Sequence, residues 1–323
     1  MDNDSSNELP EIIESCARFR HEAMSTFYEI LIVHDDYEYS RQAAQEAFTE
    51  IDRLEGELSR FVENSDVARI NSLSKDESIT VGIEAFECLS IAEKIYLDTF
   101  GAFDITIGAL FKCWLNKDKT LRKPSEEELE QAKMQTGMKF IELDEEYMTV
   151  KILADDIRVD LGGIGKGYAI DKAMDLLKLW SIETAFVHSG GSTIVASDKP
   201  EGTDGWPVTL SLPDMLWNSD PDKAYNVKVL ETIDLHNRAL SGSNLEYGKH
   251  VIDPRVGKPV EGNVAAWAIT ENGAVADGLS TAMLVMSEDE ALKYFSKYPN
   301  QSAITVGLTC DGSYQIKRYG SWK

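Results

Sequence analysis

The sequence has little that would support a structural zinc site or a disulfide scaffold. Its 323 residues include only four cysteines, and none of them stands in a CxxC pair: Cys16, Cys88, Cys113 and Cys310. Closely spaced cysteines are the usual signature of zinc sites, and dense cysteines mark small secreted disulfide frameworks. We therefore interpret the four cysteines as buried or surface thiols in a reducing compartment.

Long apolar runs are also missing. No stretch of about 18 apolar residues occurs, so no membrane-spanning helix is predicted. The N-terminal segment MDNDSSNELPEIIESCARFR has neither the basic nor the apolar region of a secretory signal, and Cys16 does not follow an apolar run. We expect a cytoplasmic protein without membrane insertion or a lipid anchor.

Positive charge is scarce. There are 32 Lys and Arg against 56 Asp and Glu, which gives a formal net charge of −24. Such a field repels nucleic-acid phosphates and anionic membranes, so we expect no nucleic-acid partner. A phosphate-bearing ligand would need a local metal ion or a set of backbone N–H groups.

The composition, 43% hydrophobic and 27% charged, is that of a globular protein with a sizeable core. Helices alternate with antiparallel-looking strands and no linker divides them, so we predict an α+β fold with mixed, largely antiparallel sheets packed with helices. We expect a flexible segment over residues 1–21 and one domain over residues 22–323. Periodicity predicts helices over 40–58, 83–99, 125–136, 166–180, 276–287 and 288–297. It predicts strands around 22–34 and over 139–143, 147–152, 157–161, 184–188, 193–197, 206–212, 225–233 and 236–241, with a closing hairpin of 303–309 and 313–319.

A glycine-rich stretch, DLGGIGKGY at 160–168, lies between a predicted strand and a predicted helix. Glycines let the backbone approach a ligand, and the first turn of a helix offers free N–H groups. The spacing fits neither a Walker A loop nor a dinucleotide fingerprint. A phosphate-binding loop and a plain tight turn both remain open for this segment.

Two oxygen-bearing side chains share one face of a predicted helix. Asp277 and Thr281 are four residues apart. A carboxylate and a hydroxyl suit Mg²⁺, which takes oxygen ligands and often shares them with phosphate. The alternative is a helix cap at Asp277 and an ordinary buried Thr281.

Three further segments carry candidate chemistry. His250 opens the sequence HVIDP and is either a general base or a structural histidine. Phe61 follows a helix end and either stacks on a flat ring or lies in the core. The segment GAFDITIG at 101–108 places an aromatic and a carboxylate, Phe103 and Asp104, in what is either a binding segment or a simple turn.

The order of these motifs along residues 22–310 resembles the ApbE family, the FAD:protein FMN transferases. The matching segments are Met24-Ser25-Thr26, Leu58 to Phe61 with Ser65 and Asn71, Gly101 to Thr106, Asp160 to Tyr168, Gly190-Gly191-Ser192, His250 to Pro254 and Ala276 to Ala282. The chain departs from the family pattern at four positions, where Ser25 replaces Gly, Gly165 replaces Ala, His188 replaces Asn and Ser192 replaces Asp.

The resemblance implies a set of FAD-binding residues. The isoalloxazine ring is expected near Met24 and Phe61. The adenine or ribose side is expected against Ala102, Phe103 and Asp104. The remaining contacts to the cofactor are expected from Gly162, Tyr168 and Val251.

It also implies a metal site and a reaction. Mg²⁺ on the FAD pyrophosphate would be held by Asp277, Thr281 and the carbonyl of Gly165. His250 would take the proton from a Ser or Thr hydroxyl of an acceptor flavoprotein, which becomes phosphoester-linked to FMN as AMP leaves. Two alternatives stay open: a Mg²⁺-dependent FAD pyrophosphatase that gives FMN and AMP, and a flavin-binding protein without turnover.

Overall fold

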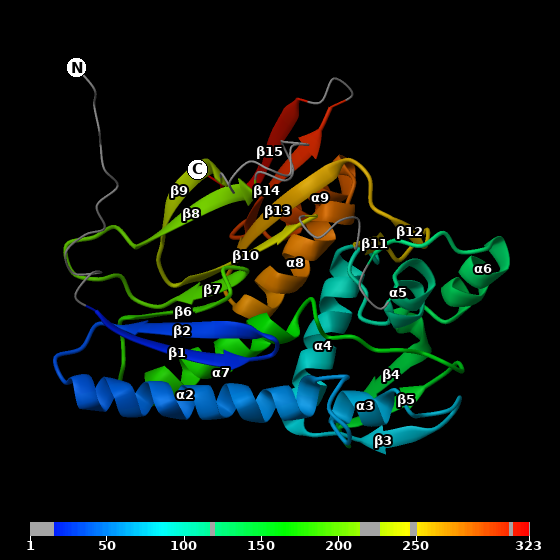
Figure 1. The fold of residues 1–323 in the computed structure, drawn as a ribbon, viewed down its shortest axis with the longest axis horizontal. Coiled ribbons are helices and arrows are strands. Elements are labelled where there is room, and N and C mark those ends of the chain that lie inside the picture. The colour runs from blue at the N-terminus through cyan, green and yellow to red at the C-terminus, as the bar shows by residue number, and fades with distance from the viewer. Residues whose placement is uncertain (1–15, 117–119, 214–226, 246–250, 310–312, 323) are drawn as a thin grey trace.

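The protein is built around one eight-stranded sheet, seen in a computed structural model that describes residues 16–116, 120–213, 227–245, 251–309 and 313–322. The strand order is β1-β2-β6-β7-β10-β13-β14-β15, and every neighbouring pair is antiparallel (Figure 1). The strands are β1 Ala17–Ala23, β2 Thr26–Ile32, β6 Ala185–Ser189, β7 Thr193–Ala196, β10 Arg238–Asn244, β13 Asn263–Thr270, β14 Ser302–Leu308 and β15 Tyr314–Gly320.

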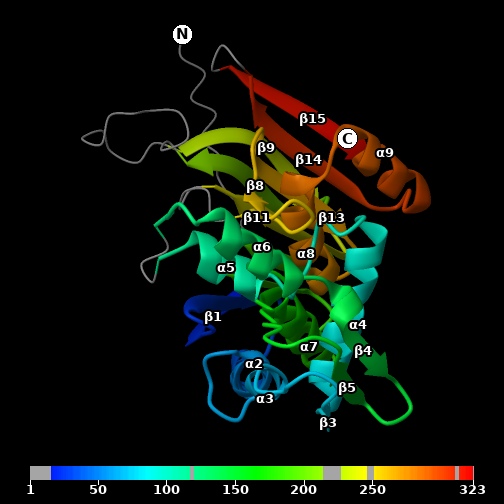
Figure 2. The ribbon, with the colours of Figure 1, turned by 90° about the vertical axis from the view of Figure 1, so that its right-hand side faces the viewer.

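Each face of this sheet carries its own apolar core. Side chains alternate between faces along a strand, so Ile30 and Ile32 of β2 enter one core while Leu31 enters the other. On the first face lie helices α7 (Gly165–Leu179) and α8 (Gly273–Val285), with α8 against β10 and β13. The long helix α2 (Tyr37–Leu58) packs on α7 and β1 as an outer layer (Figures 1 and 2).

A hairpin covers the second face. Its strands, β8 (Trp206–Pro213) and β9 (Val227–Leu235), pair antiparallel. Trp206 and Leu210 of β8 pack with Trp267 and Ile304 of the sheet in the second core. Both faces of the sheet are therefore covered, and the Asp277 cluster described below lies on the helical side.

Smaller elements surround the α7–α8 pair. A second sheet has the order β3-β5-β4, and helices α5 and α6 form a satellite core with β11 (Figure 2). The bounds are α3 Asp66–Ile70, β3 Ser78–Thr80, α4 Ile83–Asp98, α5 Gly108–Trp114, α6 Glu126–Met134, η1 Met138–Phe140, β4 Ile141–Asp144, β5 Thr149–Ile152, β11 Ile252–Asp253, β12 Lys258–Pro259 and α9 Glu288–Lys297. In the described part of the chain, no helix is long and apolar enough to cross a membrane.

The predicted α+β class is confirmed, but the start of the first strand region is different. Residues 17–21, expected in the flexible segment, form most of β1 and pair with β2. Met24 and Ser25, expected within one strand, form the turn between β1 and β2, and both have positive φ values of 49° and 59°. A two-residue turn of this kind matches the twist of an antiparallel hairpin.

One other expected strand was wrong, and one strand was missed. Residues 157–161 form no strand beyond a single bridge from Arg158 to Ile107. Instead, the Asn71 side chain substitutes for a neighbouring strand: its Oδ1 accepts from the Val159 N–H at 2.6 Å and its Nδ2 donates to the Val159 carbonyl at 2.9 Å. Conversely, β13 was not predicted, because its sequence NVAAWAIT is rich in alanine, a residue depleted in strands.

Two of the three alanines of β13 lie on the face of the sheet that α8 covers. Ala266 and Ala268 are fully buried in the core on the helical side, and they pair directly with Ser243 and Ser241 of β10. Directly opposed residues on neighbouring strands lie on the same face. Two serines and two alanines therefore form the floor beneath α8.

Candidate functional site

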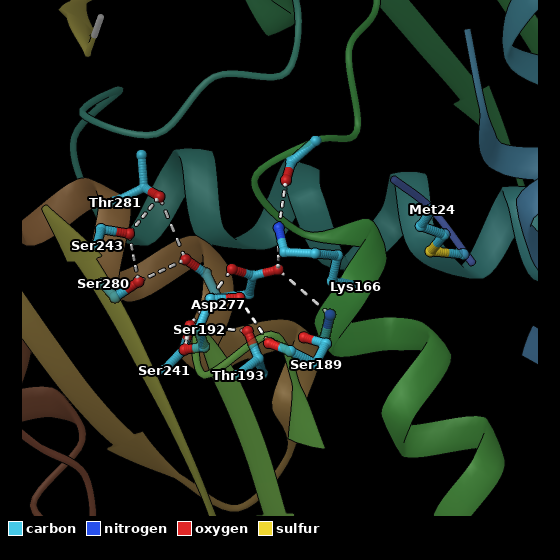
Figure 3. Close-up of polar contacts among 12 residues, drawn as sticks. Met24, Lys166, Ser189, Ser192, Thr193, Ser241, Ser243, Asp277, Ser280 and Thr281 are labelled. Carbon is cyan, nitrogen blue, oxygen red and sulfur yellow. Dashed lines mark hydrogen bonds and ion pairs between the residues drawn. The ribbon is translucent and has the colours of Figure 1, made fainter. Parts of the chain in front are cut away.

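Asp277 is the centre of a buried polar cluster (Figure 3). It lies in the second turn of α8, which begins after Asn272, whose side chain caps the helix by accepting from the Val275 N–H. The Asp277 side chain is almost fully buried, yet Oδ2 accepts from the Gly167 N–H at 3.2 Å and Oδ1 accepts from the Ser241 hydroxyl at 3.3 Å. Burial of a carboxylate is costly unless it is paired in this way.

Close approach of two helix ends brings the glycine-rich stretch to Asp277. A Cβ atom on Gly167 would lie 2.1 Å from the carbonyl oxygen of Gly273, so only glycine fits there. Asp171 of α7 fixes the same contact by accepting from the N–H groups of Gly273 and Ala274 at 2.6 and 2.9 Å. The first turns of α7 and α8 are therefore locked together, and the predicted loop residues 162–167 lie beside the predicted metal-binding residue.

Lys166 also reaches this cluster. Its ammonium donates to the Gly162 carbonyl at 3.0 Å and lies 3.8 Å from Oδ2 of Asp277. Lys166 was not among the predicted site residues. The only signal for it was its place inside the glycine-rich stretch.

Hydroxyl groups connect Thr281 to the same cluster. The Ser243 Oγ lies 3.1 Å from Thr281 Oγ1 and 2.8 Å from Ser280 Oγ, and the Ser280 hydroxyl donates to the Asp277 carbonyl at 2.9 Å. A second chain runs from Thr193 Oγ1 to Ser241 Oγ at 3.0 Å and on to Asp277. Sequence reasoning missed both β10 serines: the strand was predicted over 236–241, which includes Ser241 but ends before Ser243.

Gly165, the third predicted metal-binding residue, is the first residue of α7 and is buried. No group of three or more His, Cys, Asp or Glu side chains that would hold a metal occurs among the described residues. A cation at Asp277 would therefore take one carboxylate, with further oxygens from Thr281, the backbone and a bound phosphate. Those are hard oxygen donors, the set that Mg²⁺ prefers, so the residues present fit this ion.

Phe103 forms the wall between the glycine-rich stretch and α8. Its ring is so close that Cβ atoms on Gly163 and Gly278 would lie 3.2 and 3.5 Å from it. Ala102 beside it is also buried. The structure thus places Ala102 and Phe103, which the resemblance implied on the adenine or ribose side of FAD, next to the glycine-rich stretch.

Asp104 is occupied within its own turn. Oδ1 accepts from the Thr106 N–H at 2.7 Å and from the Thr106 hydroxyl at 2.6 Å. The Thr106 Oγ1 in turn accepts from the Gly137 N–H at 2.6 Å. Burial raises the pKa of the Asp104 carboxyl. These contacts give Asp104 a structural role in holding the segment 101–108.

Phe61 is an exposed aromatic tied to the glycine-rich stretch. Its side chain is 82% exposed, and the Arg60 guanidinium lies 4.5 Å from its ring centroid. Arg60 also lies 3.2 Å from Asp160, whose Oδ1 accepts from the Gly162 N–H at 2.8 Å. The core alternative for Phe61 is therefore excluded.

Met24 lies in the β1–β2 turn, where its sulfur accepts a hydrogen bond from the Tyr28 hydroxyl at 3.0 Å. It lines an open cleft of about 480 Å³ together with Arg20, Phe27 and Glu55. The adjacent Gly190 donates its N–H to the Phe27 carbonyl at 2.8 Å. Ser25, which replaces the family glycine, lines the same cleft.

The remaining predicted residues are less directly connected to Asp277. Tyr168 has a buried ring, and its hydroxyl donates to Glu87 of α4 at 2.7 Å; burial, followed by this carboxylate, raises its pKa. Val251 is half-buried and its carbonyl accepts from the Val260 N–H at 3.0 Å. His250 lies outside the described residues.

Comparison with known proteins supports the resemblance seen in the motifs. The ApbE family matches residues 24–305. The FAD:protein FMN transferase of Escherichia coli (strain K12) is 28% identical over 83% of this chain and 78% of its own length. The FAD:protein FMN transferase of Buchnera aphidicola subsp. Schizaphis graminum is also 28% identical, over 85% of this chain and 81% of its own.

Solved structures show the same fold. The flavin transferase ApbE from Vibrio cholerae superposes with a TM-score of 0.80 at 22% identity, covering 95% of this chain and 98% of that chain. The ApbE protein from Thermotoga maritima gives a TM-score of 0.76 at 27% identity, covering 95% and 97%. The predicted resemblance is confirmed: because the family match extends over most of its length, this chain belongs to the ApbE family.

Proposed function

We propose that this chain is an FAD:protein FMN transferase that moves FMN from FAD to a Ser or Thr hydroxyl of an acceptor flavoprotein. The names of its relatives support the transferase activity. The observation that carries the proposal is the buried Asp277, held with Thr281 against the glycine-rich start of α7. Because the chain has a net charge of −24, it would repel a pyrophosphate unless a local metal ion or backbone N–H groups bind it, and this site could supply them.

We assign Mg²⁺ to Asp277, Thr281 and the Gly165 carbonyl. The bound ion would neutralise negative charge on the FAD pyrophosphate. The hydroxyl chain through Ser243 and Ser280 orients Thr281, and the Ser241 hydroxyl fixes one oxygen of Asp277. Preorganised donors of this kind cost little reorganisation when the ligand binds.

FAD is proposed to lie across the glycine-rich stretch. The exposed ring of Phe61 is available to stack on the isoalloxazine, and Met24 lies in the cleft beside β1 and β2. Ala102 and Phe103 form the wall that supports Gly163, and Asp104 stiffens that wall from inside its turn. We retain Gly162, Tyr168 and Val251 as further contacts of the bound cofactor.

His250 is proposed as the general base. It takes the proton of the acceptor hydroxyl, whose oxygen forms a new bond to the FMN phosphorus. The bond from that phosphorus to the bridging pyrophosphate oxygen breaks, and AMP leaves with the electron pair. The products are AMP and a protein-bound FMN phosphoester, so atoms and charge balance. The acceptor is expected to share a cytoplasmic location with the enzyme.

One incubation tests the proposal. The purified chain is mixed with FAD, Mg²⁺ and an acceptor flavoprotein, and nucleotides and flavinylated protein are separated. AMP together with flavin-labelled acceptor supports the transferase. AMP with free FMN would establish the pyrophosphatase instead, and FAD binding without AMP would establish a non-catalytic flavin-binding protein.

A further inference from the structure

The carboxylate of Asp277 accepts two hydrogen bonds from its own chain and forms one ion pair. Oδ1 takes the Ser241 hydroxyl, while Oδ2 takes the Gly167 N–H and lies 3.8 Å from the Lys166 ammonium (Figure 3). Within the described residues, Asp277 is the one carboxylate that forms an ion pair with Lys166. The buried negative charge is therefore already neutralised by a lysine.

Few contacts hold the Lys166 ammonium beside Asp277. Its ammonium has one backbone partner, the Gly162 carbonyl at 3.0 Å, and its side chain is about one quarter exposed. A lysine carries its charge on a flexible four-carbon stem, so the ammonium can leave without moving the helix. The Gly167 N–H, in contrast, belongs to the locked contact of α7 with α8 and stays in place.

We infer that Lys166 is an internal counter-ion that competes with a divalent cation for Oδ2 of Asp277. This inference rests on the proposed metal site. A cation bound by Oδ2 would meet a like charge only a few ångströms away, and such repulsion is strong even with water nearby. Metal binding therefore requires the ammonium to move, and the cost of that movement lowers the affinity of the site for the metal.

The same contact gives Lys166 a second effect of opposite sign. While it neutralises Asp277, it lowers the cost of burying that carboxylate. Removing the ammonium should therefore tighten metal binding and, at the same time, destabilise the protein measured without metal. A lysine needed only for packing would lower stability but would leave metal affinity unchanged or weaker.

The test is calorimetric titration of the full chain with Mg²⁺ alone, without FAD. The variants are Lys166→Met, which removes the charge and keeps the chain length, and Lys166→Arg, which keeps the charge. Lys178→Met is the matched control, because Lys178 lies on the same helix but pairs with Asp175 and is largely exposed. Lys166→Gln serves if the methionine variant folds poorly, and thermal unfolding with and without Mg²⁺ is recorded for each protein.

Lys166→Met is expected to bind Mg²⁺ about tenfold more tightly than the unmodified chain, a factor that corresponds to about 1.4 kcal/mol. Lys166→Arg and Lys178→Met should stay within about twofold. The unfolding temperature of Lys166→Met should fall without Mg²⁺ and rise more steeply as Mg²⁺ is added.

Asp277→Ala separates two kinds of failure. If Asp277→Ala removes Mg²⁺ binding but Lys166→Met binds no tighter than the unmodified chain, the counter-ion role is wrong and the metal site stands. If Asp277→Ala leaves Mg²⁺ affinity unchanged, the proposed metal site itself is wrong. Absence of measurable binding by Lys166→Met would also overturn the inference.

Discussion

The backbone nitrogen of Gly167 donates to the carboxylate of Asp277 at 3.2 Å, although 110 residues separate the two in sequence. The contact exists because α7 and α8 touch at their first turns, backbone to backbone, at Gly167 and Gly273. A side chain at either position would force the helices apart. The chemistry of the site and the packing of the helices thus depend on the same few atoms.

Gly167→Ala is expected to destabilise the protein and to weaken FAD binding. The new methyl carbon would lie 2.1 Å from the Gly273 carbonyl oxygen, and overpacking of this kind costs about 1–3 kcal/mol. Urea unfolding measures the loss. Gly56→Ala is the control: nothing lies within 4 Å of its added carbon, so this helical position should gain stability by about 0.5–1 kcal/mol. Equal effects of the two substitutions would refute the role of the close contact.

Asp277→Asn should reduce AMP release by on the order of 10²-fold or more, the usual effect of removing a group that stabilises developing charge. The amide keeps the size of the side chain but removes its charge. AMP is quantified at saturating FAD and millimolar Mg²⁺. Near-native rates in a folded Asp277→Asn protein would show that this carboxylate holds no metal.

Phe61→Ala should weaken FAD binding without changing stability. Stacking of flat rings on aromatic side chains contributes about 1–3 kcal/mol, so the Kd is expected to rise by about tenfold. The ring is 82% exposed, so the unfolding temperature should stay the same. Flavin fluorescence titration gives the Kd. An unchanged Kd would remove Phe61 from the flavin site.

His250→Ala should slow FMN transfer by about 10²–10⁴-fold, the usual contribution of a general base. FAD and Mg²⁺ should still bind. The pH profile of the transfer rate should lose its lower limb, because a protonated imidazole cannot accept the hydroxyl proton. If the variant loses FAD binding and stability together, His250 is a structural residue; a wild-type rate would exclude it as the base.

Asp171 should make stability depend on pH between about 4 and 6. Burial raises the pKa of its carboxyl from the ordinary value of 3.8 to about 6. A carboxyl whose folded pKa is raised stabilises the fold most when protonated, so its contribution is lost as the pH rises through this range. The loss is up to about 3 kcal/mol. To measure this loss, the unfolding free energies of the unmodified chain and of Asp171→Asn are compared from pH 4 to pH 7. A difference that does not change with pH would contradict a raised pKa for Asp171.

Local sequence signals were sufficient for parts of the site. The four-residue spacing of Asp277 and Thr281 predicted that both lie on one helix face, and both do lie on α8. The helix begins three residues earlier than expected because Asn272 caps it. The glycine-rich stretch was likewise predicted to open a helix, and α7 starts at Gly165. These features depend only on neighbours within one or two turns.

The missing partners of Asp277 depend on long-range pairing. Ser241 and Ser243 reach α8 because β10 lies next to β13 in the sheet, and the alanine-rich β13 carries little strand propensity of its own. Lys166 and Asp171 act across the contact of α7 with α8, which no periodicity reveals. Residues 17–21 have too few apolar side chains to predict a strand, but β2 supplies their pairing partners.

The alanine floor of β13 has a geometric consequence. Ala266 and Ala268 stand beside Ser243 and Ser241, beneath the helix that carries Asp277 and Thr281. Because methyl side chains are small, α8 packs close to the sheet. At this distance the serine hydroxyls of β10 reach the helix. A valine or leucine in place of Ala266 or Ala268 would push α8 away from the sheet. The small side chains of β13 thus set the distance of Asp277 from the sheet.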